Sequence, residues 1–185
     1  MRYKIEDIVA LIGARRYGNA EANIEWLLTD SRSLVFPETS LFFAIKTNIG
    51  DGHNYINELY KRGVRNFVVT KLPDKYNEKY PETNFLYVID SRKALQRLSE
   101  RHREQYNIPI IGITGSNGKT IVKEWLNQLL QPVMNVTRSP RSYNSQIGVP
   151  LSVWLLDESS QIGVFEAGIS DPGEMDALRD IIQPT

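Results

Sequence analysis

The sequence contains no cysteine and only two histidines. Without cysteine the chain can form no disulfide, no thiolate nucleophile and no zinc site built on thiolates. His53 and His102 stand far apart in the sequence, with no further ligands at a metal-binding spacing. Redox and zinc chemistry are therefore not expected.

The chain also lacks a surplus of charge and a long apolar run. Its 22 basic and 22 acidic residues cancel, so we expect no general attraction to nucleic acid or to an anionic membrane. Apolar stretches such as 153–156 are far too short to cross a bilayer, and no signal-peptide pattern opens the chain. The 185 residues, 41% of them hydrophobic, predict one or two small cytoplasmic domains.

The first 106 residues predict a small mixed α/β domain. Short apolar segments alternate with two helical patterns, and a charged, proline-flanked stretch at 74–83 is expected to be a solvated loop. A longer helix is expected from Ser91, with His102 on its apolar face in a structural role. The expected strands are 23–29, 41–45, 66–70 and 85–89, and the expected helices are 5–12 and 55–61.

The pattern changes near Asn107, where strands and helices begin to alternate. The apolar run 108–113 is typical of a strand buried on both faces, and alternation of this kind predicts a parallel sheet. We therefore expect two domains, 1–106 and 107–185. The further elements expected in the second are helices at 121–130, 146–155 and 172–182 and strands at 133–137 and 162–167.

The segment 111–120, IGITGSNGKT, has the chemistry of a phosphate-binding loop with an altered spacing. The common pattern is Gly, four residues, then Gly-Lys-Ser/Thr, but Ile113 occupies the first position here. A strand precedes the loop and a helix follows it, as phosphate binding requires. The alternative is a glycine-containing turn with an accidental Gly-Lys-Thr. The predicted nucleotide-binding residues are Gly115, Ser116, Asn117, Gly118, Lys119 and Thr120.

Each part of this loop has a physical role in holding a nucleotide. Backbone N–H groups at a helix N-terminus attract an anion, and glycine lets the chain approach phosphate oxygens closely. Lys119 would place a positive charge at the β- and γ-phosphates, and the Thr120 hydroxyl would hold Mg²⁺.

The altered spacing resembles that of the Mur ligases and their folylpolyglutamate synthase relatives, whose loop reads TGxxGKT. The segments 143–150, YNSQIGVP, and 164–174, VFEAGISDPGE, resemble two further signatures of the family. In the first part of the chain, the segments TDSR, LFFA and DGH resemble its uridine-diphosphate-sugar domain; they occupy 29–32, 41–44 and 51–53. The resemblance covers nearly the whole chain.

The resemblance implies an α/β protein with a small mixed UDP-substrate domain and the first part of a parallel-sheet P-loop ATP-binding domain. It also implies an ATP-dependent, Mg²⁺-dependent amide ligase of peptidoglycan precursor synthesis that acts through an acyl phosphate. The expected partners are UDP-N-acetylmuramoyl-tripeptide and D-alanyl-D-alanine, and addition of the third amino acid of the peptide is the nearest alternative. With three predicted strands in the second domain, we expect an inactive fragment of a longer ligase.

The resemblance also implies catalytic positions. Lys119, Glu166 and Asn144 would carry catalysis, with Thr120 on one Mg²⁺ ion and Glu166 on a second. Without the family pattern, Glu166 would be read as ending a strand in solvent or pairing with a lysine, and Asn144 as part of a polar turn before a helix. The family pattern is not followed at Ser145 or at 170–171, where Ser and Asp receive no role.

In the first domain, Ser31 and Arg32 are expected to bind the uracil and diphosphate end of the substrate, because a hydroxyl and a guanidinium suit those acceptors. The alternative is an ordinary turn. Asp51 and His53 are expected to fix a turn rather than to do chemistry. The residues expected to complete the substrate pocket are Lys46, Thr47 and Asn48, although the family usually has glycine at the second of these.

Two other functional classes fit the loop alone. A GTPase-like or ATPase switch would carry a guanine-reading Asn-Lys-x-Asp string, which the sequence lacks. A non-catalytic nucleotide-sugar binding module would gain nothing from Mg-ATP. An exposed sheet edge is expected to permit self-association of the chain.

Overall fold

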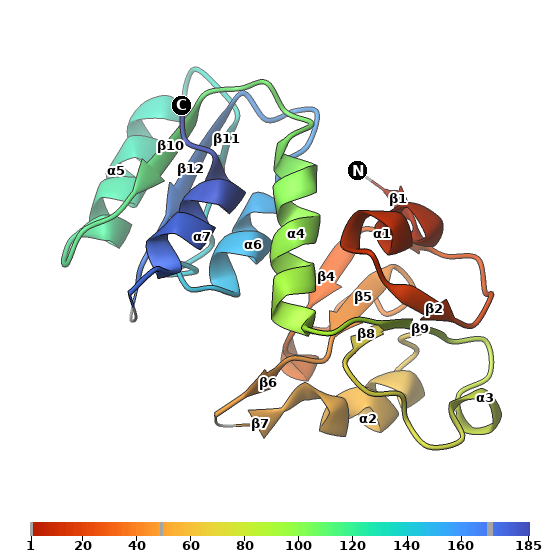
Figure 1. The fold of residues 1–185 in the computed structure, drawn as a ribbon. Coiled ribbons are helices and arrows are strands. Elements are labelled where there is room, and N and C mark those ends of the chain that lie inside the picture. The colour runs from red at the N-terminus through yellow and green to blue at the C-terminus, as the bar shows by residue number, and fades with distance from the viewer. Residues whose placement is uncertain (1, 49, 170–171) are drawn as a thin grey trace. The chain divides into compact units, whose positions relative to one another are not determined.

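The computed structural model describes residues 2–48, 50–169 and 172–185, which form two compact units, Met1–Leu95 and Gln96–Thr185. The division falls within helix α4 (Ser91–Arg103), whereas the change of sequence pattern predicted that the second domain begins at Asn107. Both units combine helices with sheets that contain parallel strands, so the expected α/β class is confirmed (Figure 1). In the described part of the chain, no helix is both long and apolar enough to span a membrane.

The first unit is built on a five-stranded sheet with the order β2-β9-β8-β5-β4. The last four strands in this order are mutually parallel, and β2 joins the edge in the antiparallel direction. Their carboxyl ends therefore share one edge of the sheet, where ligands of such sheets bind. The strands are β2 (Arg15–Tyr17), β4 (Trp26–Leu28), β5 (Ser40–Phe43), β8 (Asn66–Val69) and β9 (Asn84–Tyr87).

Two short antiparallel pairs and three helices complete this unit. Helix α1 buries the apolar residues of its i, i+3, i+7 stripe and ends where Gly13 takes a left-handed conformation with φ 65°. The paired strands are β1 (Tyr3–Lys4) with β3 (Asn23–Ile24) and β6 (Lys46–Thr47) with β7 (Gly50–Asp51). The helices are α1 (Ile5–Ile12), α2 (Ile56–Lys61) and α3 (Tyr76–Lys79), with 3-10 turns η1 (Ser31–Ser33) and η2 (Gly52–Tyr55).

The second unit has a three-stranded parallel sheet in which β12 lies between β10 and β11. Helix α5 covers one face of the sheet, and α6 and α7 cover the other (Figure 1). The apolar core lies between the sheet and helices α6 and α7. The elements are β10 (Ile110–Ile113), α5 (Lys119–Leu130), β11 (Val136–Arg138), α6 (Gly148–Val153), β12 (Ile162–Glu166) and α7 (Glu174–Ile182).

The end of α4 is bound into this second unit by two buried side chains. His102 forms a 2.9 Å hydrogen bond with the backbone carbonyl of Leu156, which agrees with the structural role expected for it. Arg103 donates to the carbonyls of Ile182 and Gln183, at 3.0 and 3.1 Å, and so satisfies acceptors at the end of α7 that have no partner within the helix.

Three expectations about local structure were wrong. The predicted strand 23–29 is two strands, β3 and β4, which pair in different sheets. The predicted loop 74–83 contains α3, because Tyr76 and Tyr80 pack edge-on against Phe85 of the core. The predicted strand 108–113 is not buried on both faces: β10 is an edge strand, and of its four residues only Ile110 is buried.

Candidate functional site

Three segments of the second unit meet at the carboxyl edge of its sheet. The glycine loop follows β10, Glu166 is the last residue of β12, and the segment 139–144 follows β11. Because the three strands are parallel neighbours, their carboxyl ends lie at the same edge, and Ile113 pairs directly with Glu166. The topology therefore brings together residues from three predicted motifs.

The loop has the backbone geometry of an anion-binding turn. Gly115 has φ 141° and Gly118 has φ 80°, in the region that side chains with a Cβ disfavour. Gly118 precedes the first residue of α5, so the unpaired N–H groups and positive end of a 12-residue helix face the loop. Residues 114–118 are all exposed, and their backbone is open to a ligand.

The Lys119 side chain contacts the backbone of this loop. Its Nζ donates to the carbonyl oxygen of Gly115 at 2.7 Å, so the ammonium lies beside the backbone that the sequence assigns to phosphate. This hydrogen bond is exposed to solvent and can be exchanged for a bond to a ligand oxygen.

Thr120 contacts Glu166 directly. The Thr120 hydroxyl donates to Oε2 of Glu166 at 3.0 Å, and the hydroxyl of Ser142 lies 3.4 Å from it. The two residues expected to be cation ligands are thus adjacent.

Glu166 is fully buried, and a lysine accompanies it. The Lys123 ammonium lies 2.9 Å from Oε1, and the hydroxyl of Ser139 accepts a hydrogen bond from the Glu166 backbone N–H at 3.1 Å. The lysine contact is an ion pair rather than a directed hydrogen bond, since Oε1 accepts no hydrogen bond of normal geometry. The alternative in which Glu166 ends its strand in solvent is wrong. The alternative in which it pairs with a lysine is confirmed, and it coexists with the Thr120 contact.

Asn144 lies at the same edge. Its backbone carbonyl accepts from the N–H of Gly168 at 2.8 Å, and a Cβ added to Gly168 would come within 3.1 Å of the Asn144 carboxamide. The neighbouring Ser145 accepts hydrogen bonds from the N–H groups of Ile147 and Gly148, at 3.4 and 3.1 Å, at the start of α6. A capping role therefore accounts for the serine that departs from the family pattern.

The described residues fit a hard divalent cation bound together with phosphate. Mg²⁺ usually takes one or two protein oxygens and completes its shell with water and phosphate oxygens. The buried carboxylate of Glu166 and the hydroxyl of Thr120 offer such oxygens, and Oε1 of Glu166 retains acceptor capacity. In the ranges that the structure describes, no group of three or more His, Cys, Asp or Glu side chains could hold a metal alone, so phosphate oxygens would have to contribute.

In the first unit, Ser31 and Arg32 follow β4 at the carboxyl edge of the five-stranded sheet. Ser31 is buried, and its carbonyl accepts from Arg62 at 2.7 Å, whereas the Arg32 side chain is 87% exposed. Arg32 is held by Asp30, with Nη2 2.6 Å from Oδ2. The hydrogen bond from the Arg32 side chain lowers the pKa of Asp30 below its ordinary value.

The other three residues predicted to bind substrate lie beyond the neighbouring strand, β5. Lys46 and Thr47 form β6, Asn48 is in the turn after it, and all three are exposed. Since β4 and β5 are parallel neighbours, both predicted groups lie beyond the same edge of the sheet.

His53 stabilises the turn η2 through hydrogen bonds of its ring. Its Nδ1 lies 2.6 Å from Oδ1 of Asp51, and its Nε2 accepts from the N–H of Thr70 at 3.1 Å, which places the ring proton on Nδ1. Both ring nitrogens are thus engaged within the fold, which supports the expected structural role. Ser170 and Asp171, to which the sequence analysis gave no role, lie outside the described residues.

Sequence reasoning missed Lys123, Ser139 and Ser142. Lys123 lies three and four positions after Thr120 and Lys119, so it shares their face of α5, and this spacing was the available signal. The two serines carried no signal, because their place beside Glu166 depends on the pairing of β11 with β12.

A strand, a glycine loop and a helix that begins with Lys-Thr, with a carboxylate on the next strand of the sheet, are the features of a P-loop nucleotide-binding domain. Residues 113–185 match the family model described as the Mur ligase middle domain. This part of the chain belongs to the Mur ligase family.

Relatives of one kind match the whole chain. It is 34% identical over 194 aligned residues to the UDP-N-acetylmuramoyl-tripeptide--D-alanyl-D-alanine ligase of Borreliella burgdorferi, covering 100% of this chain and 42% of the relative. A crystal structure of MurF from Acinetobacter baumannii superposes with a TM-score of 0.89 at 28% identity, covering 100% of this chain and 40% of that one.

A third comparison includes a nucleotide complex. The MurF ligase from Thermotoga maritima in complex with ADP superposes with a TM-score of 0.72 at 27% identity, covering 86% of this chain and 36% of that chain. The chain thus spans about two fifths of the length of the relatives it matches.

Proposed function

We propose that this chain is the substrate-holding and phosphate-binding part of an ATP-dependent amide ligase that joins D-alanyl-D-alanine to UDP-N-acetylmuramoyl-tripeptide. The observation that carries the proposal is the meeting of Thr120 with the buried carboxylate of Glu166 at the mouth of the phosphate loop, 3.0 Å apart. The names of relatives that match the whole chain support the choice of substrates.

A single shared Mg²⁺ ion would fit this contact. Mg²⁺ usually takes one or two oxygens from the protein, and Thr120 Oγ1 and Glu166 Oε2 are two such oxygens, 3.0 Å apart. We therefore propose that they serve one ion, rather than the two separate ions that the family resemblance implied.

The protein's part in the first chemical step would be positioning and charge stabilisation. The substrate carboxylate attacks the γ-phosphorus of ATP, the bond to the ADP oxygen breaks, and an acyl phosphate forms. The loop amides and Lys119 are suited to hold the phosphates as negative charge shifts toward ADP. A bound Mg²⁺ would neutralise part of that charge.

In the second step, the amine of D-alanyl-D-alanine attacks the acyl carbon, the carbon–oxygen bond to phosphate breaks, and the nitrogen loses a proton to give the amide. Asn144 is suited to orient the acyl group, since its carboxamide lies over Gly168, two residues beyond Glu166. The chain spans about two fifths of its relatives, so we propose that these 185 residues bind ligands but do not complete the reaction.

The first unit would bind the uridine end of the substrate. Two groups of residues follow the adjacent parallel strands β4 and β5: Ser31 and Arg32 follow β4, and 46–48 follow β5. This arrangement supports one shared pocket. Arg32 offers a guanidinium suited to a diphosphate, and its exposure leaves it available to a ligand.

Isothermal titration calorimetry tests the proposal with the chain as it is. We expect UDP-N-acetylmuramoyl-tripeptide to bind more tightly than UDP-N-acetylmuramoyl-dipeptide. Its affinity should be the same for the wild type and for Lys119→Ala. Mg-ADP should bind the wild type and lose most of its affinity in Lys119→Ala. Failure of every uridine compound to bind a folded chain would leave an ATP-binding domain of another function.

Two further expectations from the sequence stay predictions. Both β10 and β11 are edge strands, although Thr185 donates its N–H to Ile110 and covers part of the β10 edge. Self-association through the open edges would appear as concentration-dependent mass in sedimentation experiments. The cytoplasmic location expected from the sequence is the second of these predictions.

A further inference from the structure

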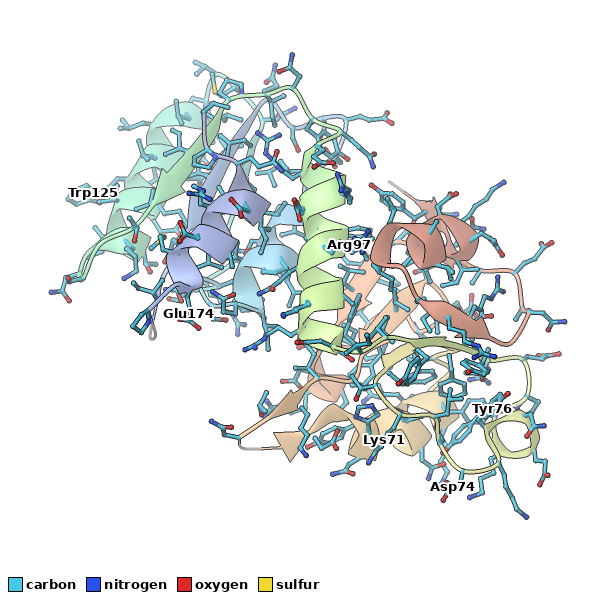
Figure 2. The ribbon with its side chains drawn as sticks, in the orientation of Figure 1. Lys71, Asp74, Tyr76, Arg97, Trp125 and Glu174 are labelled. Atoms are coloured by element: carbon cyan, nitrogen blue, oxygen red, sulfur yellow. The ribbon has the colours of Figure 1, made fainter. Side chains whose placement is uncertain are left out.

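Lys123 is the only fully buried side chain of α5, a helix that the structure describes completely. Apolar side chains on the same helix face solvent instead: Trp125 is 63% and Leu129 is 73% exposed, and Trp125 projects away from the sheet (Figure 2). Burying a lysine is costly unless its charge is paired and its donors are used. A helix that buries a lysine while it exposes a tryptophan therefore calls for a specific role for that lysine.

The Lys123 ammonium satisfies its donors at the site. It donates to the carbonyl oxygens of Ser139, at 2.9 Å, and of Arg141. It also lies 2.9 Å from Oε1 of Glu166 and 3.2 Å from Oε1 of Glu124. Two backbone carbonyls thus accept hydrogen bonds from the ammonium, and its charge is paired with two carboxylates.

These contacts join the segment after β11 to the end of β12. Arg141 has φ 48°, a left-handed backbone that a residue with a side chain adopts only at a cost, and its carbonyl is held by Lys123. The same segment supplies Ser139, whose hydroxyl binds the backbone N–H of Glu166, and Ser142, whose hydroxyl lies 3.4 Å from that of Thr120. Lys123 therefore contacts both the segment after β11 and the Glu166 carboxylate.

The two oxygens of Glu166 are therefore in different surroundings. Oε1 faces the Lys123 ammonium inside the protein, and Oε2 faces the Thr120 hydroxyl at the loop. We propose that Lys123 is a positioning residue: it holds Oε1 so that Glu166 presents Oε2 alone, beside Thr120, to the divalent cation of a bound nucleotide. This inference rests on the proposed function, because it assumes that a Mg-nucleotide binds at the loop.

A competing effect has the opposite sign. A positive charge next to a cation ligand repels the cation, so removal of Lys123 could tighten binding through electrostatics alone. Against this, a buried carboxylate without its partner turns away or recruits another group, and loss of the groups that orient a metal ligand typically costs 10- to 100-fold in metal affinity. We expect the orienting effect to win, because the Lys123 ammonium is tied to two backbone carbonyls and its position is set by the fold.

The test measures Mn²⁺ binding by electron paramagnetic resonance, with ADP present, in five forms of the chain: wild type, Lys123→Met, Glu166→Gln, the double variant and Glu124→Gln. Lys123→Met should weaken Mn²⁺ about tenfold or more. In the Glu166→Gln background, Lys123→Met should have little further effect, because it acts through the carboxylate. Glu124→Gln is the matched control: it removes the half-exposed carboxylate on the same ammonium, and we expect a change of less than about twofold.

Unaltered or tighter Mn²⁺ binding in Lys123→Met, with wild-type binding intact, would overturn the inference and leave the proposed function standing. Failure of the wild type to bind Mn²⁺ with ADP in a Lys119-dependent way would overturn both. Lys123→Met could also fail to fold, since it leaves Glu166 buried without a counter-charge. A crystal structure of the wild-type chain with Mg²⁺ and a non-hydrolysable ATP analogue then decides. We expect the contact between Lys123 and Oε1 of Glu166 to persist. A metal bound by both carboxylate oxygens of Glu166, with the lysine displaced, would refute the proposal.

Discussion

Thr120 and Glu166 are 46 positions apart in the sequence, yet the hydroxyl of one donates to the carboxylate of the other at 3.0 Å. The contact arises because β10 and β12 are parallel neighbours with Ile113 opposite Glu166, so α5 begins beside the end of β12. It joins the phosphate loop to a buried carboxylate, and two distant motifs thereby form one candidate cation site.

Thr120→Val keeps the shape of the side chain and removes its hydroxyl. We expect the Mg²⁺-dependent part of the ADP affinity to fall about tenfold, because one hard oxygen ligand is lost together with the hydrogen bond that orients Glu166. Calorimetry with and without Mg²⁺ measures this part. Thr120→Ser retains the hydroxyl and should bind as the wild type does; a valine variant with full Mg²⁺ dependence would exclude a ligand role for Thr120.

His102 should make the second unit sensitive to acid. Burial lowers its pKa from the ordinary 6.5 to about 4, although its hydrogen bond with the Leu156 carbonyl opposes the shift. Because the pKa is lower in the folded chain than in the unfolded chain, the unfolded chain takes up the proton first as the pH falls. Stability is thus complete above about pH 6.5 and is lost toward pH 4, by up to about 3 kcal/mol.

Denaturant unfolding across that pH range measures the effect. His102→Phe keeps an aromatic ring against Trp154, whose ring centroid is 4.6 Å away, and removes the titrating group. The variant should be less stable at neutral pH because it lacks the hydrogen bond, but its stability should depend less on pH. An equally steep pH dependence in the variant would assign the acid sensitivity to other groups.

Gly52→Ala should destabilise the first unit. An added Cβ would lie 2.8 Å from the backbone nitrogen of Ile45 and 2.9 Å from Cα of Ala44, so backbone must move. We expect the free energy of unfolding to fall by about 2 kcal/mol, as in other overpacked sites. Gly50→Ala, two residues earlier in β7, is the control, since nothing lies within 4 Å of its added Cβ. Urea unfolding that gives equal stabilities for the two variants would contradict the close packing at Gly52.

Arg32→Ala should weaken the binding of UDP-N-acetylmuramoyl-tripeptide about tenfold or more, because a charge-assisted hydrogen bond to the diphosphate is lost. The fold should be unaffected, since the side chain is 87% exposed and its partner Asp30 is also near the surface. Arg2→Ala removes another exposed arginine with a carboxylate partner, Glu25, and should bind normally. Equal loss in both variants would indicate a general charge effect, and no loss in either would remove Arg32 from the proposed site.

Local sequence determined much of what was expected. Glycines at 115 and 118, followed by Lys119 and Thr120, specify a turn and a helix start through backbone freedom and charge, and the structure has both. Alternation of apolar runs specified the parallel strands β11 and β12 with helix α6 between them, because buried strands and amphipathic helices have different periods.

Tertiary structure alone decided where several of these elements are buried. Periodicity places apolar residues inside, but α5 buries Lys123 and exposes Trp125, because the carboxylate that pairs with the lysine arrives from β12, forty-three positions after it. The run at 108–113 is as apolar as a central strand, yet β10 lies at an edge, since strand order depends on which later segment pairs with it. The sequence by itself determined the loop, its helix and the alternation of elements; the pairing of distant strands decided which side chains surround Glu166, because those contacts exist only after the sheet has formed.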